Sequence, residues 1–556
     1  MELHGVGVGQ GVAVGPVLRM PPPLPEPAMA SHAGDAHAEF ASVTVALAAV
    51  AEQLRERCAR VAEADGRTML EAAAQMAEDP TLVVDVRARI DAGSTGERAV
   101  FDAFAAFQSA LAALGGVMAE RQNDLADVAQ RIIAQLRGVA APGVPHSNTP
   151  YILVAADLAP ADTALLDLTK VLALVTVEGG PTSHTAILAR SRSIPAIVGV
   201  AAAAELSNDT IVLVDAAANR ITVAPSAEAI AEAHARSAQR SATASAHVTK
   251  NGLGTHQPGM LKDGTAIALL ANLSSPAEAA EAVALGAEGV GLFRTEFLFL
   301  NATTAPSVDE QRRHYSALLS HFGGKKVVVR VLDAGADKPL RFLAVAHEQN
   351  PALGVRGLRA LRANENVLRD QLTALAQAQA ENHAELWVMA PMVTDAEEVD
   401  YFVALSRELG LSTVGVMAEV PSIAMLVNQV FETADFVSIG TNDLSQYTLA
   451  ADRMLGSLAH FHDPWHPAIL RLVKLIGDAG LAAAKPVGVC GEAAADPQLA
   501  VVLVGLGATT LSMTPAALAD VRAELAKYTL AEAQQFAVRA INARTAAAAR
   551  AGFAAG

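Results

Sequence analysis

The second half of the chain contains eight short apolar runs that alternate with segments of helical pattern. The runs occupy residues 265–272, 289–294, 326–332, 386–392, 414–419, 435–440, 485–490 and 508–513. Nearly continuous apolar strands that alternate with helices predict a parallel sheet buried on both faces. Eight such units in one stretch of chain predict that this sheet closes into a (β/α)8 TIM barrel, which we place at residues 256–556.

The first part of the chain is organised differently, and the whole sequence predicts a multidomain α/β protein. Between residues 31 and 140, apolar residues recur at spacings of three and four, which predicts an antiparallel bundle of helices. Strand-like runs follow at residues 151–155, 171–177 and 210–216. They predict an α/β domain formed by residues 141–225 together with the glycine-rich β segment within residues 1–30, so that the bundle is an insertion. Residues 226–255 are rich in small and polar residues and predict a helical linker.

The composition limits the classes of function. With a net charge of −17 and a pI of about 5.3, the chain is an unsuitable partner for nucleic acid. It begins without the basic and apolar segments of a signal peptide and has no apolar run long enough to span a bilayer, so we expect no membrane insertion. The two cysteines, Cys58 and Cys490, lie far apart in sequence, which excludes a disulfide framework and fits a reducing cytoplasm. Cys58 falls on the apolar stripe of a predicted helix, which favours a small core residue.

Polar residues follow nearly every strand of the predicted barrel, at the end where the active sites of such barrels lie. In chain order the residues at these strand ends are Asn272, Arg294, Glu296, Arg330, Asp333, Lys338, Met392, Glu419, Asn442, Asp443, Cys490, Glu492 and Ser512, all of them polar except Met392 and Cys490. A scaffold without a site would end its strands in turn residues of mixed kind. The pattern therefore predicts a binding site, with ordinary solvated loops as the alternative interpretation.

Charges of both signs gather at these strand ends. Guanidinium groups bind phosphate or carboxylate through two parallel hydrogen bonds, so the basic residues together predict an anion site, although each alone would fit a surface salt bridge. The carboxylates of Glu419 and Asp443 follow neighbouring strands and suit Mg²⁺, with substrate phosphate completing the coordination shell. The alternative role for either carboxylate is helix capping or pairing with an arginine. The basic residues are Arg294, Arg330, Lys338, Arg356 and Arg453.

Cys490 lies within this set, in the segment GVCGEA. A thiol with an ordinary pKa near about 8.5 is mostly protonated at neutral pH and can donate a proton, although an inert cysteine is the alternative interpretation. The barrel thus predicts a site for a small molecule that carries phosphate and carboxylate groups, together with Mg²⁺. It contains no obvious nucleophile.

The segment EGGPTSHTAILAR, residues 178–190, offers the nucleophile that the barrel lacks. Gly179 and Gly180 permit a tight turn, and Pro181 suits the first position of a helix. We therefore expect His184 in the first helical turn, where the helix dipole keeps the imidazole neutral and favours a bound phosphoryl group. A structural histidine at a helix start is the alternative, but a phosphate-binding barrel without its own nucleophile favours a chemical role.

These segments resemble those of the phosphoenolpyruvate-utilising enzymes. GGPTSHTAILARSRSIPAIVG resembles the phosphohistidine motif of that family. The resemblance extends over essentially the whole chain to one class of the family, the enzymes I of the sugar phosphotransferase system. The segments that carry it are GVGLFRTEFLF, NPALGVRGLR, GVMAEVPS, SIGTNDLSQYTLAADR and GVCGEAAADP. Two departures concern loop shape: Pro181 stands where many members carry arginine, and Ala336 stands where a glycine is usual.

The resemblance implies a phosphotransferase that moves the phosphoryl group of phosphoenolpyruvate to its own His184 and then to a histidine of the phosphocarrier protein HPr. Thr163 would hold His184 in its resting orientation, and Cys490 would protonate the enolate carbon to give pyruvate. Glu419 and Asp443 would bind Mg²⁺. The residues implied to bind the substrate are Arg294, Arg330, Lys338, Arg356, Asn442, Asp443 and Arg453.

The same resemblance implies the partners and the setting. The helical bundle would dock HPr, the barrel would form a homodimer, and the reaction would be the first step of the sugar phosphotransferase system in the cytoplasm. The linker would be the pivot between the two transfer steps. Two alternatives are a dikinase or phosphoenolpyruvate synthase, which needs a nucleotide-binding domain, and a regulatory protein that binds metabolite without turnover. We find no glycine-rich ATP loop, and the complete set of reactive residues argues against a regulator.

Overall fold

The computed structural model divides the chain into two compact units, Met1–Ala238 and Gln239–Gly556. It describes residues 1–554 except 10, 22–23, 33, 59–63, 115–121, 140, 146, 157, 159–165, 168, 180–184, 187–188, 190–193, 217, 237–256, 301, 303, 336–339, 341, 344–347, 454, 456–457 and 459–460. Within this described part, every helix is too short or too polar to cross a bilayer.

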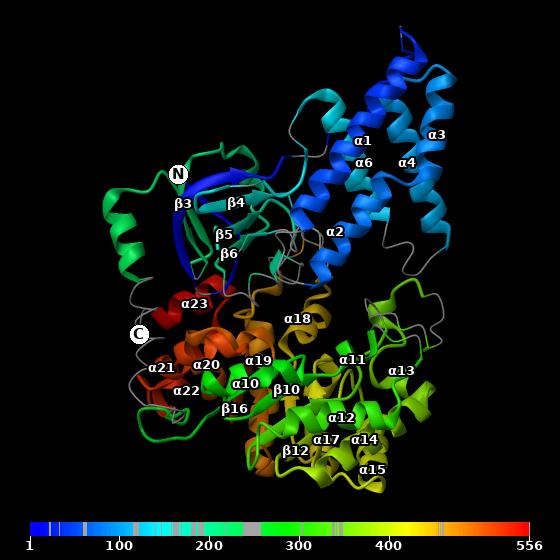
Figure 1. Cartoon of the computed structure of the whole chain (residues 1–556). Helices are drawn as coiled ribbons and strands as arrows, with labels where there is room; N and C mark the ends of the chain where they lie inside the picture. Colours follow the sequence, from blue (N-terminus) through cyan, green and yellow to red (C-terminus); the bar gives the residue numbers. More distant parts are fainter. Residues whose placement is uncertain are drawn as a thin grey trace. The chain divides into compact units, whose positions relative to one another are not determined.

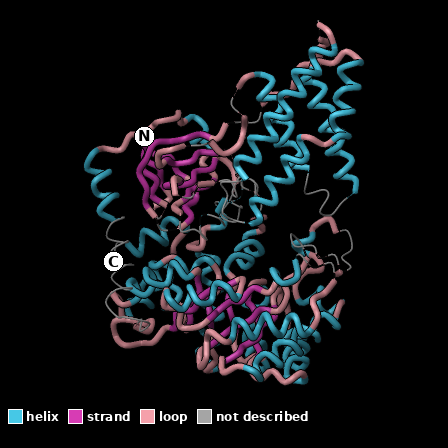
Figure 2. Tube along the Cα trace, viewed as in Figure 1, coloured by secondary structure: helices cyan, strands magenta, loops and turns pink. Residues whose placement is uncertain are grey.

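The first unit contains an eight-stranded mixed sheet (Figures 1 and 2). Its strands are β1 (Glu2–His4), β2 (Val6–Val8), β3 (Val12–Arg19), β4 (Tyr151–Ala155), β5 (Val171–Thr176), β6 (Ala196–Val198), β7 (Ile211–Asp215) and β8 (Arg220–Val223). The order across the sheet is β1-β8-β7-β3-β4-β5-β6-β2, parallel from β3 to β6 and antiparallel on either side. Because β3 pairs with both β4 and β7, the N-terminal segment belongs to this sheet, which confirms the prediction from the sequence.

The sequence analysis did not predict β6 and β8. The first has three residues, too few for an alternating or continuous apolar pattern to be recognised. The second buries Ile221 alone among its four side chains, so it lacks the apolar run of a core strand.

Five helices between β3 and β4 form the helical bundle of the described chain. They are α1 (Ala36–Cys58), α2 (Ala64–Ala77), α3 (Pro80–Asp91), α4 (Gly96–Leu114) and α6 (Gln122–Arg137). Their apolar faces share one core, in which the predicted stripe residues Val43, Leu47, Val50 and Leu54 of α1 are buried. Cys58, the last residue of α1, is half-buried against the same core, as expected for a small packing residue.

The second unit is a closed barrel of eight parallel strands (Figure 1). The strands are β9 (Ala268–Leu273), β10 (Val290–Arg294), β11 (Lys326–Arg330), β12 (Glu385–Ala390), β13 (Val414–Ala418), β14 (Val437–Ile439), β15 (Val487–Val489) and β16 (Thr510–Met513). Each of the eight apolar runs identified in the sequence forms one of these strands, so the predicted TIM barrel is confirmed. Before the barrel, residues 227–236 are helical, and the rest of the predicted linker lies outside the described residues.

Helices follow the strands and cover the outside of the barrel (Figure 2). They are α10 (Ala279–Ala284), α11 (Glu296–Leu300), α12 (Val308–Leu319), α13 (Leu358–Ala363), α14 (Glu365–Glu381), α15 (Ala396–Glu408), α16 (Pro421–Met425), α17 (Val427–Thr433), α18 (Thr441–Leu449), α19 (Pro467–Ala483), α20 (Pro497–Gly505), α21 (Leu518–Leu525), α22 (Leu530–Asn542) and α23 (Ala546–Ala554). Short 3₁₀ helices occur at Ala201–Glu205, Pro276–Glu278, Pro351–Leu353, Glu492–Ala495 and Pro515–Ala517.

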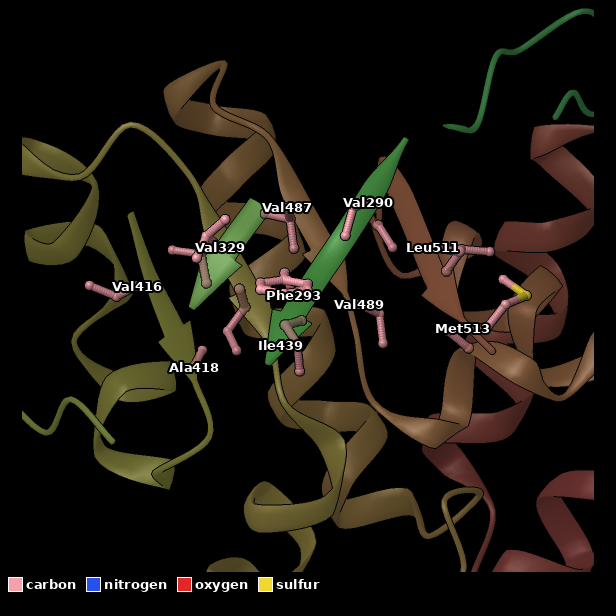
Figure 3. Close-up of a cluster of buried hydrophobic side chains, with 14 of the residues drawn as sticks. Val290, Phe293, Val329, Val416, Ala418, Ile439, Val487, Val489, Leu511 and Met513 are labelled. Carbon is pink, nitrogen blue, oxygen red and sulfur yellow. The ribbon is translucent and has the colours of Figure 1, made fainter. Parts of the chain in front are cut away.

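The alternation of side chains along each strand separates an outer core from the barrel interior. In β11, Val327 and Val329 join the large apolar core that the strands share with the helices. Figure 3 shows side chains of that core, Val329 among them, on neighbouring strands. Lys326 and Val328 of the same strand instead line a cavity inside the barrel. The parallel strands also bring all their carboxyl ends to one mouth of the barrel, where the described site residues of this unit lie.

Gly477 of α19 provides a test of the packing around the barrel. A Cβ atom there would stand 2.0 Å from the carbonyl oxygen of Leu506, so we expect Gly477→Ala to lower the free energy of unfolding by about 1–3 kcal/mol. Gly552 of α23 is the matched control, because a Cβ there meets nothing within 4 Å and alanine favours a helix by up to about 1 kcal/mol. Both tryptophans, Trp387 and Trp465, belong to the barrel unit, so urea unfolding followed by tryptophan fluorescence reports on that unit. A urea midpoint for Gly477→Ala equal to that of the wild-type protein would contradict the close approach of Gly477 to the carbonyl oxygen of Leu506.

Candidate active site at the carboxyl end of the barrel

The structure brings most of the predicted site residues to one mouth of the barrel. Arg294 and Arg330 are the last residues of β10 and β11 and lie opposite each other in that parallel pair. The others at this mouth are Arg356 before α13, Glu419 after β13, Asn442 and Asp443 in α18, Arg453 after α18, and Cys490 after β15. The predicted residues Thr163, His184 and Lys338 lie outside the described residues, as do Pro181 and Ala336.

A buried ion pair fixes the guanidinium group of Arg330, which is 5% exposed. Its Nη2 lies 2.6 Å from Oε1 of Glu296, and its Nη1 lies 3.4 Å from Oδ2 of Asp333. Burial disfavours the cation, but the carboxylates of Glu296 and Asp333 outweigh burial and raise the pKa of Arg330. The side chain is therefore a permanent cation whose planar fork is held in one orientation.

A second buried fork joins the segment after β11 to α18. Arg356 donates to both carboxylate oxygens of Asp333, at 3.2 and 3.1 Å, and to both of Asp443, at 2.9 and 3.2 Å. It also donates to the hydroxyl of Tyr447 at 3.1 Å. Arg453 approaches the same Asp443 carboxylate at 3.5 Å. Asp443 thus has the arginine partners that were one alternative from the sequence, and its lone pairs are numerous enough to serve a cation as well.

The carboxylate of Glu419 is buried between neighbouring strand ends and is 1% exposed. Its Oε1 accepts the backbone N–H of Met392 at 2.7 Å. Met392 has a φ of 57°, in the left-handed region, where a non-glycine residue carries a strain of roughly 1–3 kcal/mol. Gly440 lies next to the carboxylate. A Cβ atom at this position would stand only 2.9 Å from Oε2 of Glu419, so a residue without a side chain is needed there. The backbone is therefore shaped around this carboxylate.

Glu419 and Asp443 differ in their electrostatic surroundings. Burial, together with the negative charge of Asp443, raises the pKa of Glu419. Burial also opposes ionisation of Asp443, but Arg453 and Arg356 outweigh it and lower the pKa of Asp443. The negative charge at Glu419 is thus poorly compensated by the protein, and a divalent cation held between the two carboxylates would neutralise it. Among the described residues, no group of three or more His, Cys, Asp and Glu side chains is arranged to hold a metal.

Cys490 is buried on the inner side of this mouth and is 3% exposed. Its Sγ donates to the carbonyl oxygen of Ile439 at 3.5 Å. Burial raises the pKa of the Cys490 thiol to about 11, although a hydrogen bond from Ser438 opposes part of that rise. The thiol is therefore protonated at neutral pH, as a proton donor must be. Asn272 of β9 donates to the carbonyl oxygen of Cys490 at 3.0 Å and so ties the two strand ends together.

The sequence analysis found the cations of this site and the carboxylates at the strand ends, but not how they pair. Glu296 and Asp333 were recognised as strand-end residues, yet the sequence carries no signal that they pair with Arg330 and Arg356. Tyr447, which hydrogen-bonds Arg356, was not identified at all. Its position four residues after Asp443, on the same face of α18, is the one feature that could have indicated it.

Three family models match the chain. The model described as PEP-utilising enzyme, PEP-binding domain, matches residues 249–530; the mobile domain of the same enzymes matches 148–219, and their N-terminal domain matches 4–121. A protein named phosphoenolpyruvate-protein phosphotransferase from Streptomyces coelicolor is 51% identical over 97% of this chain and 96% of its own length. A protein of the same name from Geobacillus stearothermophilus is 34% identical over 96% of this chain and 94% of its own. Among solved structures, a solution structure of Enzyme I is 27% identical and covers 43% of this chain and 99% of its own, with a TM-score of 0.39.

The raised pKa of Cys490 predicts slow and strongly pH-dependent alkylation. A thiol with a pKa of about 11 is about 0.1% thiolate at pH 8, so we expect iodoacetamide to modify it at least about 100-fold more slowly than free cysteine. The rate should then rise about tenfold per pH unit up to pH 10. Mass spectrometry of the Cys58→Ser variant, which retains Cys490 as its single cysteine, measures this rate. A plateau near pH 8.5 would contradict the shift, because burial without a shifted pKa slows the reaction and leaves the shape of the profile unchanged.

Proposed function

The chain belongs to the phosphoenolpyruvate-utilising enzymes, and from this premise we propose that it moves the phosphoryl group of phosphoenolpyruvate to its own His184 and then to a histidine of HPr. Pyruvate is released in the first transfer. The observation that carries the proposal is the barrel mouth, where fixed guanidinium forks, a carboxylate pair and a protonated thiol meet. Such a site fits a small substrate that carries both phosphate and carboxylate groups.

In the proposed reaction the arginines bind the substrate and stabilise the charge that spreads over the phosphoryl oxygens. Arg294 and Arg330 hold the phosphoryl group from adjacent strands. Arg453 and the Asn442–Asp443 segment position the rest of the molecule, and Arg356 and Lys338 support them. Because Glu296 and Asp333 already orient the fork of Arg330, little reorganisation is required when the charge moves.

Glu419 and Asp443 would hold Mg²⁺, and their chemistry fits that ion. Both are oxygen ligands, and the raised pKa of Glu419 indicates negative charge that the surrounding residues do not balance. When bound, Mg²⁺ would supply additional positive charge to the phosphoryl oxygens. The chain's own contribution is to keep two carboxylates at neighbouring strand ends, with the Met392 N–H fixing the orientation of Glu419.

Cys490 completes the first transfer as the acid that gives its Sγ proton to the enolate carbon, which yields pyruvate. In the first unit, Thr163 orients His184 between transfers. The helical bundle at residues 31–140 docks HPr, and the barrel at residues 256–556 forms the homodimer. Since the nucleophile and the substrate site belong to different compact units, residues 226–255 serve as the pivot that lets them meet. Both cysteines are free thiols, which agrees with the cytoplasmic setting expected from the sequence.

Labelling with radioactive phosphoenolpyruvate and Mg²⁺ tests the proposal. We expect the protein to gain one acid-labile, base-stable phosphoryl group, which His184→Ala abolishes and added HPr removes. His4→Ala is the matched control, because His4 is an exposed histidine of the same unit, and this variant should label normally. A label that persists in His184→Ala, or a wild-type protein that gains none, would refute the proposal.

Arg330→Lys tests the role of the guanidinium fork. The substitution keeps the positive charge but removes the paired donors, so kcat/KM for phosphoenolpyruvate should fall about 10²–10³-fold. Pyruvate formation coupled to lactate dehydrogenase, with HPr in excess, measures the rate. Arg312→Lys is the control, because Arg312 makes its ion pair with Glu381 on the outer helices, and its kcat/KM should change less than about twofold. Equal kcat/KM values for the two variants would show that Arg330 does not act on the substrate.

A further inference from the structure

A cavity lies inside the barrel at the end opposite the candidate active site. Its rim is formed at the amino ends of strands, by Lys326 at the start of β11, by Thr510 at the start of β16 and by Phe436 just before β14. Ser438 and Gly488, in the middle of β14 and β15, form its inner wall. The cavity has room for about one or two water molecules.

The cavity exists because glycine replaces a side chain in the barrel interior. Such interiors are normally filled by layers of bulky residues. At Gly488, a Cβ atom would stand 2.8 Å from Oγ1 of Thr510 and 3.6 Å from Oγ of Ser438. Two hydroxyl groups therefore flank a position that carries no side chain.

The polar groups around this cavity suit bound water. Lys326 and Thr510 make no side-chain hydrogen bond or ion pair with any other residue of the described chain, although Nζ of Lys326 lies 3.7 Å from the centre of the Trp387 ring. A buried water molecule needs two to four polar partners. The Lys326 ammonium, the Thr510 hydroxyl and the Ser438 hydroxyl can provide them.

Ser438 connects the cavity to Cys490. Ser438 pairs with Gly488, two residues before Cys490, in the adjacent strands β14 and β15, and its hydroxyl lowers the pKa of the Cys490 thiol. In the thiol form, the Sγ proton points to the carbonyl oxygen of Ile439, at 3.5 Å. A single hydroxyl group thus separates the buried sulfur from a cavity at the far end of the barrel.

This inference rests on the proposed function, in which Cys490 loses one proton in every turnover and must regain one. We propose that Ser438 and water in the cavity return this proton from the amino end of the barrel, away from the substrate. The Cys490 Sγ proton goes to the enolate carbon, the Ser438 hydroxyl gives its proton to the thiolate, and Ser438 takes a proton from the cavity water. The water takes one from the Lys326 ammonium, and solvent reprotonates Lys326, so the cycle consumes one solvent proton. Ser438 is a positioning and relay residue that acts through Cys490.

The acidities of the two terminal groups support this direction of transfer. Burial lowers the pKa of Lys326 to about 8 and raises the pKa of Cys490 to about 11. A proton therefore moves favourably from the Lys326 ammonium to the Cys490 thiolate. The route also explains why these interior positions carry hydroxyl groups and a glycine in place of the usual bulky aliphatic residues.

Rapid-quench measurement of pyruvate, with the full-length protein, Mg²⁺ and excess HPr, tests the route. We expect Ser438→Ala to form the first equivalent of pyruvate at the wild-type rate, using the resident proton, and then to turn over at least tenfold more slowly. Ser438→Thr should restore turnover, because it keeps the hydroxyl group. Thr510→Val, which removes one water partner but no volume, should also show the burst and a slower steady state.

The first equivalent shows that each variant is folded and phosphorylated, so the later rate isolates proton return. Steady-state turnover of Ser438→Ala equal to wild type would overturn the route, as would Ser438→Thr turning over as slowly as Ser438→Ala. If Ser438→Ala does not fold, equal steady-state rates for Thr510→Val and wild type overturn it. Failure of the underlying function would look different, since the wild-type protein would then gain no label on His184.

Discussion

The candidate site depends on a series of buried ion pairs that links the segments after β10, β11 and β14. Glu296 holds Arg330, Asp333 contacts both Arg330 and Arg356, and Asp443 closes the series. Burying charges is costly, and apolar residues of similar volume often stabilise a protein as well or better, whereas breaking such a pair costs about 3–5 kcal/mol. The series is therefore poorly explained by stability. Its value is that carboxylates from three strand ends hold the guanidinium groups of Arg330 and Arg356 in fixed orientations.

Much of the fold could be predicted from the sequence, because each barrel strand is a short run of consecutive apolar residues. The site was predictable to the extent that it follows from those runs, since residues such as Arg330 and Glu419 come directly at the end of a strand. The ion-pair partners of these residues were not predictable from the sequence. Glu296 and Arg330 are 34 positions apart, and only the parallel register of β10 and β11 brings them to 2.6 Å. The left-handed backbone of Met392 also has no local signal, because the neighbouring carboxylate and strand ends impose it.

The barrel keeps acidic groups in different protonation states within a small volume. Arginine partners keep Asp443 ionised, burial raises the pKa of Glu419, and an apolar interior keeps the Cys490 thiol protonated. The two carboxyl groups at the mouth differ because Arg453 and Arg356 lie beside Asp443, and the thiol differs from both because it lies in a deeper, apolar layer. Charged residues occupy the mouth, the thiol lies just beneath it among Met389 and Met417, and hydroxyl groups continue toward the opposite end. One scaffold thereby separates the place where an anion would bind from the place where a proton would enter.

We propose that the mouth of the barrel binds phosphoenolpyruvate through its arginines together with a divalent cation at Glu419 and Asp443. Calorimetric titration of phosphoenolpyruvate into His184→Ala protein, which cannot turn over, tests this most directly when it is done with and without Mg²⁺. We predict binding that Mg²⁺ tightens at least tenfold, and loss of that Mg²⁺ dependence when Glu419→Gln is added. Equal affinities with and without Mg²⁺, or an unchanged Mg²⁺ effect in the Glu419→Gln protein, would contradict the account.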